Sequence, residues 1–283
     1  MLNFECLMNS MQMAHTLKRI EGMFLLLLII TISSCGPNQL WTFDHDIQLD
    51  DVSPNGITII NDQIWIADTD NNRLVQIDSH GAIQDEVVEV DRPMHISQHS
   101  GKPLLSEYGS DLIRVLNKGV LDTVHITAVP DGPASVDIYG DRIAVADFYN
   151  HRVIYEIDGV EHHIGKKGDA DGEFHYPTDV QFFEDQIFVA DAYNHRVQVF
   201  NLQGEHLKTI AADSGMNAAT GIFVNEQYVV VADFENDRVL TYSHEGDQLD
   251  IMAEGFHRPT DVLLHNDKLY VLNFKGKFIS VFN

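Results

Sequence analysis

The sequence of 283 residues predicts an all-β chain that folds as a six-bladed β-propeller with four strands in each blade. One observation is a string that occurs twice, because VADFYNHRVIYE at residues 145–156 returns as VADAYNHRVQVF at residues 189–200. A second is that weaker copies of this string recur at a nearly constant period. A third is that each repeat unit consists of short runs rich in β-branched and aromatic residues, and that no segment shows a convincing helical pattern.

Six units can be aligned on the residue that ends the second predicted strand of each unit. The aligned residues are separated by 39, 40, 44, 42 and 40 positions, and they are Asp68, Glu107, Asp147, Asp191, Asp233 and Asn273. Repeats of this period are typical of propellers with one unit per blade. The second unit is degenerate, because Glu107 replaces Asp and Leu112 stands where other units have Arg, and the sixth unit has a shortened loop after Asn273.

The fourth unit shows the order of strands within a blade. Its four predicted strands are residues 178–184, 186–192, 196–201 and 205–210. Turn residues separate them, including Glu184 and Asp185 in a tight turn and Gly204 before the last strand. The inner strands are apolar on both faces, which predicts a sheet that packs between two neighbouring sheets.

An Asp and an Arg recur five positions apart in four units. The pairs are Asp68 with Arg73, Asp147 with Arg152, Asp191 with Arg196, and Asp233 with Arg238. The Asn and His residues between them suit a turn, because Asn tolerates left-handed backbone and its side chain can bond nearby amides. We therefore predict that each pair forms a charged hydrogen bond that holds a turn, and that these residues are structural rather than catalytic.

The two ends of the repeat array predict how the ring closes. The sixth unit stops after its third strand, KFISVFN at residues 277–283, while residues 40–50 precede the first unit and belong to no earlier one. The early segment alternates, and its apolar residues are Trp41, Phe43, Ile47 and Leu49. We predict that it supplies the fourth strand of blade six, hides the open sheet edge and buries Trp41 and Phe43.

These placed motifs resemble the NHL repeat. In the fourth unit, P-T-D-V is followed by a strand ending in V-A-D and then by x-N-x-R-V-x-V-F, and GDADGEFHYP at residues 168–177 resembles the Gly-rich start of an NHL blade. The resemblance extends over residues 39–283, with the second and sixth units diverging most. It implies a propeller, for which six blades is a usual number in this family.

The N-terminus reads as a targeting segment. Lys18 and Arg19 precede a short apolar run that ends in small residues, which is typical of a secretory signal. ISSCG at residues 32–36 resembles the bacterial lipobox, which implies cleavage before Cys35 and lipidation of Cys35. We therefore expect a lipid-anchored, extracytoplasmic protein of the bacterial cell envelope. The expected division of the chain is a lipoprotein signal peptide at residues 1–35 and an NHL-type propeller at residues 36–283.

Composition narrows the classes of partner. The chain has 18 Lys and Arg residues against 43 Asp and Glu residues, a formal charge of −25. Because nucleic-acid affinity depends on basic side chains that displace counterions, this balance excludes a nucleic-acid partner. Cys6 and Cys35 are the two cysteines, and cleavage would leave Cys35 alone, so we expect neither a disulfide nor a cysteine-based metal site.

Two sets of residues should gather at one mouth of the ring. One set lies at the start of each unit's first strand, and the other lies in the aromatic-rich loop after each second strand. The resulting ligand-binding candidates are His95, Tyr108, Tyr149, Asp179, Tyr193, His195, Phe234 and Asp261. Aromatic and acidic groups around a depression suit a small-molecule or peptide site. The alternative is that the rings pack against the next blade and that the acids bond turn amides.

Two classes of function remain. Because the sequence has no nucleophile elbow, phosphate loop or zincin helix, we assign no catalytic residue, metal or cofactor, and we favour a module that binds a protein, peptide or glycan. The alternative is a metal-dependent propeller enzyme. Amidating lyases resemble NHL proteins, and that resemblance implies a central metal held by several His residues, of which the chain supplies His95. A resemblance to gluconolactonase-like enzymes implies calcium in the channel, with Asp179 and Asp261 as candidate ligands.

Overall fold

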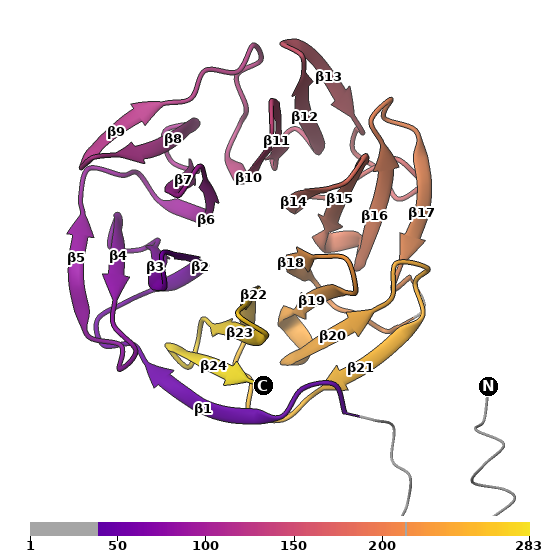
Figure 1. Cartoon of the computed structure of the whole chain (residues 1–283). Coiled ribbons are helices and arrows are strands. Elements are labelled where there is room, and N and C mark those ends of the chain that lie inside the picture. Colours follow the sequence, from indigo (N-terminus) through magenta and orange to yellow (C-terminus); the bar gives the residue numbers. More distant parts are fainter. Residues whose placement is uncertain (1–38, 213) are drawn as a thin grey trace, which may run out of the picture. The chain divides into compact units, whose positions relative to one another are not determined.

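The computed structural model describes residues 39–212 and 214–283 as six four-stranded antiparallel sheets arranged in a ring (Figure 1). The predicted all-β, six-bladed propeller is therefore confirmed. In each blade the first strand faces the centre of the ring and the last strand lies on the outside (Figure 1). The short 3-10 turns η2 (Ala192–Asn194) and η3 (Phe234–Asn236) follow the second strands of blades four and five.

The strands are ordered from the centre outwards in every blade. Blade one has β2 (Pro54–Ile60), β3 (Gln63–Asp68), β4 (Arg73–Ile77) and β5 (Ile83–Val87). Blade two has β6 (Pro93–His99), β7 (Lys102–Glu107), β8 (Leu112–Asn117) and β9 (Val120–Thr123). Blade three has β10 (Pro133–Tyr139), β11 (Arg142–Asp147), β12 (Arg152–Ile157) and β13 (Val160–Ile164). Blade four has β14 (Pro177–Phe183), β15 (Gln186–Asp191), β16 (Arg196–Asn201) and β17 (His206–Ile210). Blade five has β18 (Ala219–Val224), β19 (Val229–Asp233), β20 (Arg238–Tyr242) and β21 (Gln248–Met252). Blade six has β22 (Pro259–His265), β23 (Lys268–Asn273), β24 (Phe278–Phe282) and β1 (Phe43–Gln48).

The hydrophobic core lies between the blades. Strands β15 and β19 are buried almost throughout, whereas the outer strand β5 is largely exposed. Between blades four and five, for example, Phe188 and Val199 pack against Val231 and Leu240. A sheet covered on both faces needs apolar residues at successive positions, which explains the continuous apolar runs of the inner strands.

The N-terminal segment closes the ring as predicted. Strand β1 pairs antiparallel with β24, with Ile47 opposite Ile279. Trp41 precedes β1 and is buried, and its Nε1 donates a hydrogen bond to Thr241 Oγ1 at 3.2 Å. The predicted burial of Phe43 is wrong, because its side chain is 55% exposed. Strand β1 is the outermost strand of its blade and is largely exposed, and the ring of Phe43 contacts the ring of Phe282.

The predicted Asp–Arg pairs hold the turns after the second strands. In blade four the Arg196 Nε donates to Asp191 Oδ2 at 2.9 Å, and Asn194 Nδ2 donates to the same oxygen at 2.9 Å. Equivalent Arg–Asp bonds of 2.7, 2.6 and 2.5 Å occur in blades one, three and five. In these four blades the residue directly before the Arg has left-handed backbone, as His195 does with φ 56°. The Asn whose side chain bonds the Asp does not have this conformation. The expected left-handed role of Asn is correct in blade one alone, at Asn72.

Degenerate blade two keeps an ionic contact by a different route. Its Glu107 is buried and accepts a hydrogen bond from Ser110 Oγ at 2.6 Å. Arg114, two positions beyond Leu112, places its Nη1 3.6 Å from Glu107 Oε1. The longer Glu side chain thus contacts an Arg that lies two residues further along β8 than the Arg of the other blades.

The predicted signal peptide and Cys35 lie outside the described residues. Within the part of the chain that the structure describes, no helix has the length and apolar character to cross a membrane.

Candidate functional site

The centre of the ring contains six equivalent positions, one near the start of each first strand. In chain order they are Gly56, His95, Ser135, Asp179, Gly221 and Asp261. Blades two, four and six carry an imidazole or a carboxylate, and the alternating blades carry Gly or Ser. The glycines are needed for close approach, since a Cβ at Gly221 would lie 2.7 Å from Asp261 Cα and one at Gly56 would lie 2.9 Å from His95 Cα.

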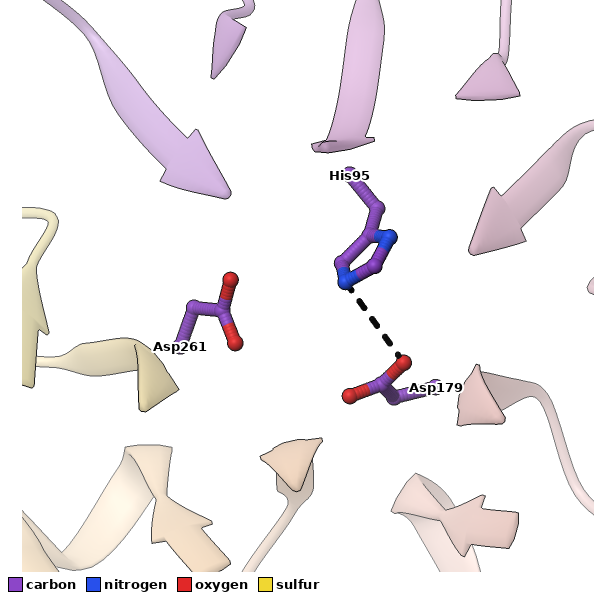
Figure 2. Close-up of side chains that lie close together, drawn as sticks. All are labelled: His95, Asp179 and Asp261. Atoms are coloured by element: carbon purple, nitrogen blue, oxygen red, sulfur yellow. Dashed lines mark ion pairs between the residues drawn. The ribbon is translucent and has the colours of Figure 1, made fainter. Parts of the chain in front are cut away.

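His95, Asp179 and Asp261 converge in the channel, and we call them the channel triad (Figure 2). One ligand atom from each residue lies within 4.8 Å of one ligand atom from both others. His95 Nε2 is 3.8 Å from Asp179 Oδ1, and the two carboxylates are nearly fully buried. The structure therefore brings together three of the residues predicted from the sequence.

The two carboxylates of the channel triad also bind backbone amides of the next blade. Asp179 Oδ2 accepts the N–H of Ile222 at 2.8 Å, and Asp261 Oδ2 accepts the N–H of Ile57 at 2.9 Å. Each Oδ1 accepts the N–H of the residue that follows in its own strand. First strands expose an unpaired edge to the channel, so these carboxylates help to satisfy edge amides. Asp179 and Asp261 therefore have a structural role whether or not a ligand binds.

His95 differs from the two carboxylates in its bonding. Its Nδ1 is buried without a hydrogen-bond partner among the described residues. Its Nε2 faces Asp179 beyond hydrogen-bond length. Buried polar atoms are normally satisfied by a protein group, by water or by a ligand, and the described chain supplies no protein group to this one. This imidazole is therefore the member of the channel triad with the strongest claim to bind a ligand.

Burial changes the protonation of the acidic residues in the channel. The pKa of Asp261 is raised to about 7, mainly by burial; His95 lowers this pKa, and nearby Asp179 raises it. Burial likewise raises the pKa of Asp179. It is also the main reason that the pKa of Asp137, two residues after Ser135 on β10, is raised to about 6. Closely spaced buried carboxylates are costly to ionise together unless a cation offsets their charge.

The channel triad separates two cavities. A cavity of about 170 Å³ opens toward the loops after the second strands, and its lining includes Phe148, Phe234, His95 and Asp261. A cavity of about 410 Å³ extends toward the hairpins between first and second strands, and it is also lined by His95 and Asp261. We call the first side the mouth face and the second side the hairpin face.

A connected set of aromatic rings covers part of the mouth face. Tyr108 of blade two contacts Phe148 and Tyr149 of blade three, with ring centroids 5.9 and 5.5 Å apart. Tyr176 lies 4.6 Å from Phe148 and 5.3 Å from Tyr193 of blade four. We call these five residues the aromatic surface. The side chains of Tyr149 and Tyr193 are 48% and 56% exposed.

The hydroxyl groups of Tyr108 and Tyr149 are hydrogen bonded to each other. Burial, and then this bond, raise the pKa of Tyr108, which keeps its hydroxyl protonated. Three of the five residues, Tyr108, Tyr149 and Tyr193, are candidates predicted from the sequence, whereas Phe148 and Tyr176 are not among the predicted candidates. Tyr176 directly precedes Pro177, at a position that carries no aromatic residue in the other five units.

His195 and Phe234 are not part of the aromatic surface and make other contacts. The His195 Nδ1 accepts the N–H of Ala218 at 3.0 Å, which links blade four to blade five, while the rest of its ring is exposed. The corresponding residues of blades one, two, three and five make the same kind of link to the next blade. Phe234 is half-buried beneath the Arg258 guanidinium, 5.1 Å from its ring centroid.

Comparisons with known proteins agree with the fold. Residues 174–200, which span most of β14–β16, match the family model of the NHL repeat. A search of curated proteins found no match. Among solved structures, a streptogramin B lyase is 17% identical with a TM-score of 0.64, and the alignment covers 83% of this chain and 81% of that chain.

Two further structures are of virginiamycin B lyase from Staphylococcus aureus. A selenomethionine-substituted form is 15% identical with a TM-score of 0.61, and the alignment covers 83% of each chain. A catalytically inactive form with quinupristin is 15% identical with a TM-score of 0.62, covering 84% of this chain and 88% of that chain. At such identities the similarity establishes a shared fold alone. The chain is thus a six-bladed propeller similar in fold to these lyases, and its fourth blade matches the NHL repeat.

Proposed function

We propose that this chain is a lipid-anchored protein of the bacterial cell envelope that binds a protein, peptide or glycan on its mouth face. The observation that carries the proposal is the aromatic surface, which joins three blades and leaves Tyr149 and Tyr193 half exposed. Contiguous exposed apolar groups are often functional. Tyrosines also provide large contact areas at a low cost in conformational entropy.

The test compares tyrosines on opposite faces of the ring. Full-length protein extracted in detergent is applied to arrays of peptides and of glycans, and the strongest ligand is titrated against Tyr193→Ala and Tyr139→Ala. Tyr139, at the hairpin end of β10, is 53% exposed and makes a matched control. We expect Tyr193→Ala to weaken binding at least about tenfold, equal to roughly 1.4 kcal/mol, and Tyr139→Ala to bind normally. Equal affinities for both variants would contradict the proposed surface.

A second candidate, a metal-dependent enzyme, is supported by the channel triad. One imidazole nitrogen and two carboxylates suit zinc or a similar divalent transition metal better than calcium, which prefers six to eight oxygen ligands. The donors fit such an ion, because their ligand atoms converge within 4.8 Å and His95 Nε2 faces Asp179 Oδ1 at 3.8 Å without forming a hydrogen bond. A bound cation would supply Lewis-acid chemistry at the floor of the mouth-face cavity.

Metal content separates the two candidates. Protein purified without chelator is analysed by mass spectrometry beside His95→Ala, with His99→Ala on the same strand as the control. A metal-dependent function predicts close to one equivalent of divalent metal in the wild type and in His99→Ala, and loss of that metal from His95→Ala. If the wild-type protein takes up no metal, even after incubation with zinc, the metal-dependent function is contradicted. The carboxylates of the channel triad would then have only their structural role as acceptors of backbone N–H groups.

A further inference from the structure

The cavity on the hairpin face has the size and lining of a second ligand site. We call it the hairpin chamber. Its volume of about 410 Å³ lies within the range of small-molecule sites, roughly 300–1,000 Å³. It shares His95 and Asp261 with the mouth-face cavity but otherwise has its own walls. A molecule bound there would not touch the aromatic surface.

The walls of the hairpin chamber differ from one side of the ring to the other. Each first strand contributes the residue two positions after its channel residue to the lining. Blades one to four carry polar residues there, namely Thr58, Ser97, Asp137 and Gln181, whereas blades five and six carry Phe223 and Leu263. The chamber is therefore amphipathic, with a polar wall facing an apolar wall. This asymmetry is a feature of this sequence, since a strict sixfold repeat would place similar residues all round.

The polar wall is held in place by contacts with the neighbouring blades. Asp137 Oδ2 accepts the N–H of Phe182 at 2.8 Å, and Gln181 Oε1 accepts the N–H of Val224 at 2.6 Å. One hydrogen bond uses a fraction of the acceptor capacity of a carboxylate, which has about four lone-pair sites. Asp137 can thus keep its bond to blade four and still accept a proton donor from the chamber.

The charge of the hairpin chamber favours a cation. Its lining includes the carboxylates of Asp137, Asp179 and Asp261, and no Lys or Arg of the described chain is among the lining residues. Its two imidazoles are His95, at the channel triad, and His265, whose Nε2 is paired with Asp62 at 2.9 Å. An inorganic cation would leave the apolar wall unused, whereas an organic cation would contact both walls.

We infer that the hairpin chamber binds a small organic monocation, with its ammonium group at Asp137 and its apolar body against Phe223 and Leu263. An ammonium group has three proton donors and no acceptor, which complements a wall rich in oxygen acceptors. The apolar wall would remove the body of the ligand from water. Such a ligand is distinct in chemistry and in place from a partner held on the mouth face.

The test uses benzylammonium as the probe and benzyl alcohol as its uncharged counterpart. Binding to full-length protein in detergent is measured by calorimetry at pH 7.5 in the presence of a chelator. We expect saturable binding of benzylammonium and at least about tenfold weaker binding of benzyl alcohol. Equal binding of the two probes, or no saturable binding of benzylammonium, would overturn the inference.

Two nearly isosteric variants assign the site to the polar wall. Asp137→Asn keeps an oxygen for the N–H of Phe182 but removes the charge, so we expect benzylammonium to bind at least about tenfold more weakly. Gln181→Glu keeps an acceptor for Val224 and adds a charge, so we expect tighter binding. Tyr193→Ala should leave benzylammonium binding unchanged, which separates this site from the proposed mouth-face surface. Unchanged affinity in both chamber variants would place the probe elsewhere and contradict the inference.

Discussion

At the scale of single residues, the hydrogen bonds that a side chain already makes indicate whether a recurring residue of the repeat is structural or is available to bind a ligand. Asp191 is fully buried and accepts hydrogen bonds from Arg196, Asn194 and the N–H of His175. Its acceptors serve the turn, as the spacing of Asp and Arg predicted. His95 occupies a repeated position too, but its Nδ1 has no partner among the described residues, and this difference appears only when the blades are assembled.

The acidic residues in the channel predict an unusual dependence of stability on pH. Asp261 has a folded-state pKa raised to about 7, above its ordinary value of about 3.9. Between these values the folded state binds more protons than the unfolded state, so the free energy of unfolding falls as the pH rises through this window. For this group alone the loss is on the order of 4 kcal/mol, since the two pKa values differ by about 3 and each pKa unit corresponds to about 1.4 kcal/mol.

Asp261→Asn isolates that contribution, because Asn resembles the protonated carboxyl. Denaturant unfolding in chelator at pH 5 and pH 8 should show a smaller loss of stability for Asp261→Asn than for the wild type. Asp141→Asn, exposed in the turn between β10 and β11, is the control and should keep the wild-type slope. Identical slopes for Asp261→Asn and the wild type would show that the carboxylate is already offset in the folded protein.

At the scale of strands, the repeat predicted most of the structure because each run of apolar residues must fit between two other sheets. The pairing of β1 with β24 was also predictable, since one strand was missing at the end of the array and one was spare at its start. The orientation of individual residues was less predictable. Trp41 and Phe43 are two positions apart, so alternation along a strand would place both side chains on the same face. Trp41 instead lies before the strand and packs against Tyr228 of blade five.

Trp41 and Phe43 provide a matched test of ring closure. Trp41 is 5% exposed and Phe43 is 55% exposed, although both lie in the closing segment. Trp41→Ala should lower the free energy of unfolding by about 3–5 kcal/mol, as expected for a large side chain removed from a core. Phe43→Ala should lower it by less than about 1 kcal/mol, because most of its ring already contacts water. Denaturant titration of both variants measures the difference, and equal losses would show that the closing segment is not anchored at Trp41.

At the scale of the whole molecule, the period and the strand pattern were enough to predict the ring, but the functional asymmetry was only partly predictable. The channel triad could be located from aligned positions, because equivalent residues of a propeller must face one another. Tyr176 and Asp137 could not, since their importance depends on contacts between blades. His195 was selected for its residue type, whereas its position in the repeat gives its Nδ1 a link to the next blade.

The proposed membrane anchor is testable independently of the propeller. With a formal charge of −25, the protein gains no electrostatic attraction to an anionic membrane, so its association should depend on acyl chains at Cys35. Cells are labelled with a fatty-acid analogue, and the protein is immunoprecipitated from wild type, Cys35→Ser and Cys6→Ser. We expect label in the wild type and in Cys6→Ser, because the proposed cleavage before Cys35 would remove Cys6. Cys35→Ser should be unlabelled and should migrate as the longer precursor. Equal labelling of Cys35→Ser and the wild type would refute the lipobox interpretation, because the label would then be attached at a residue other than Cys35.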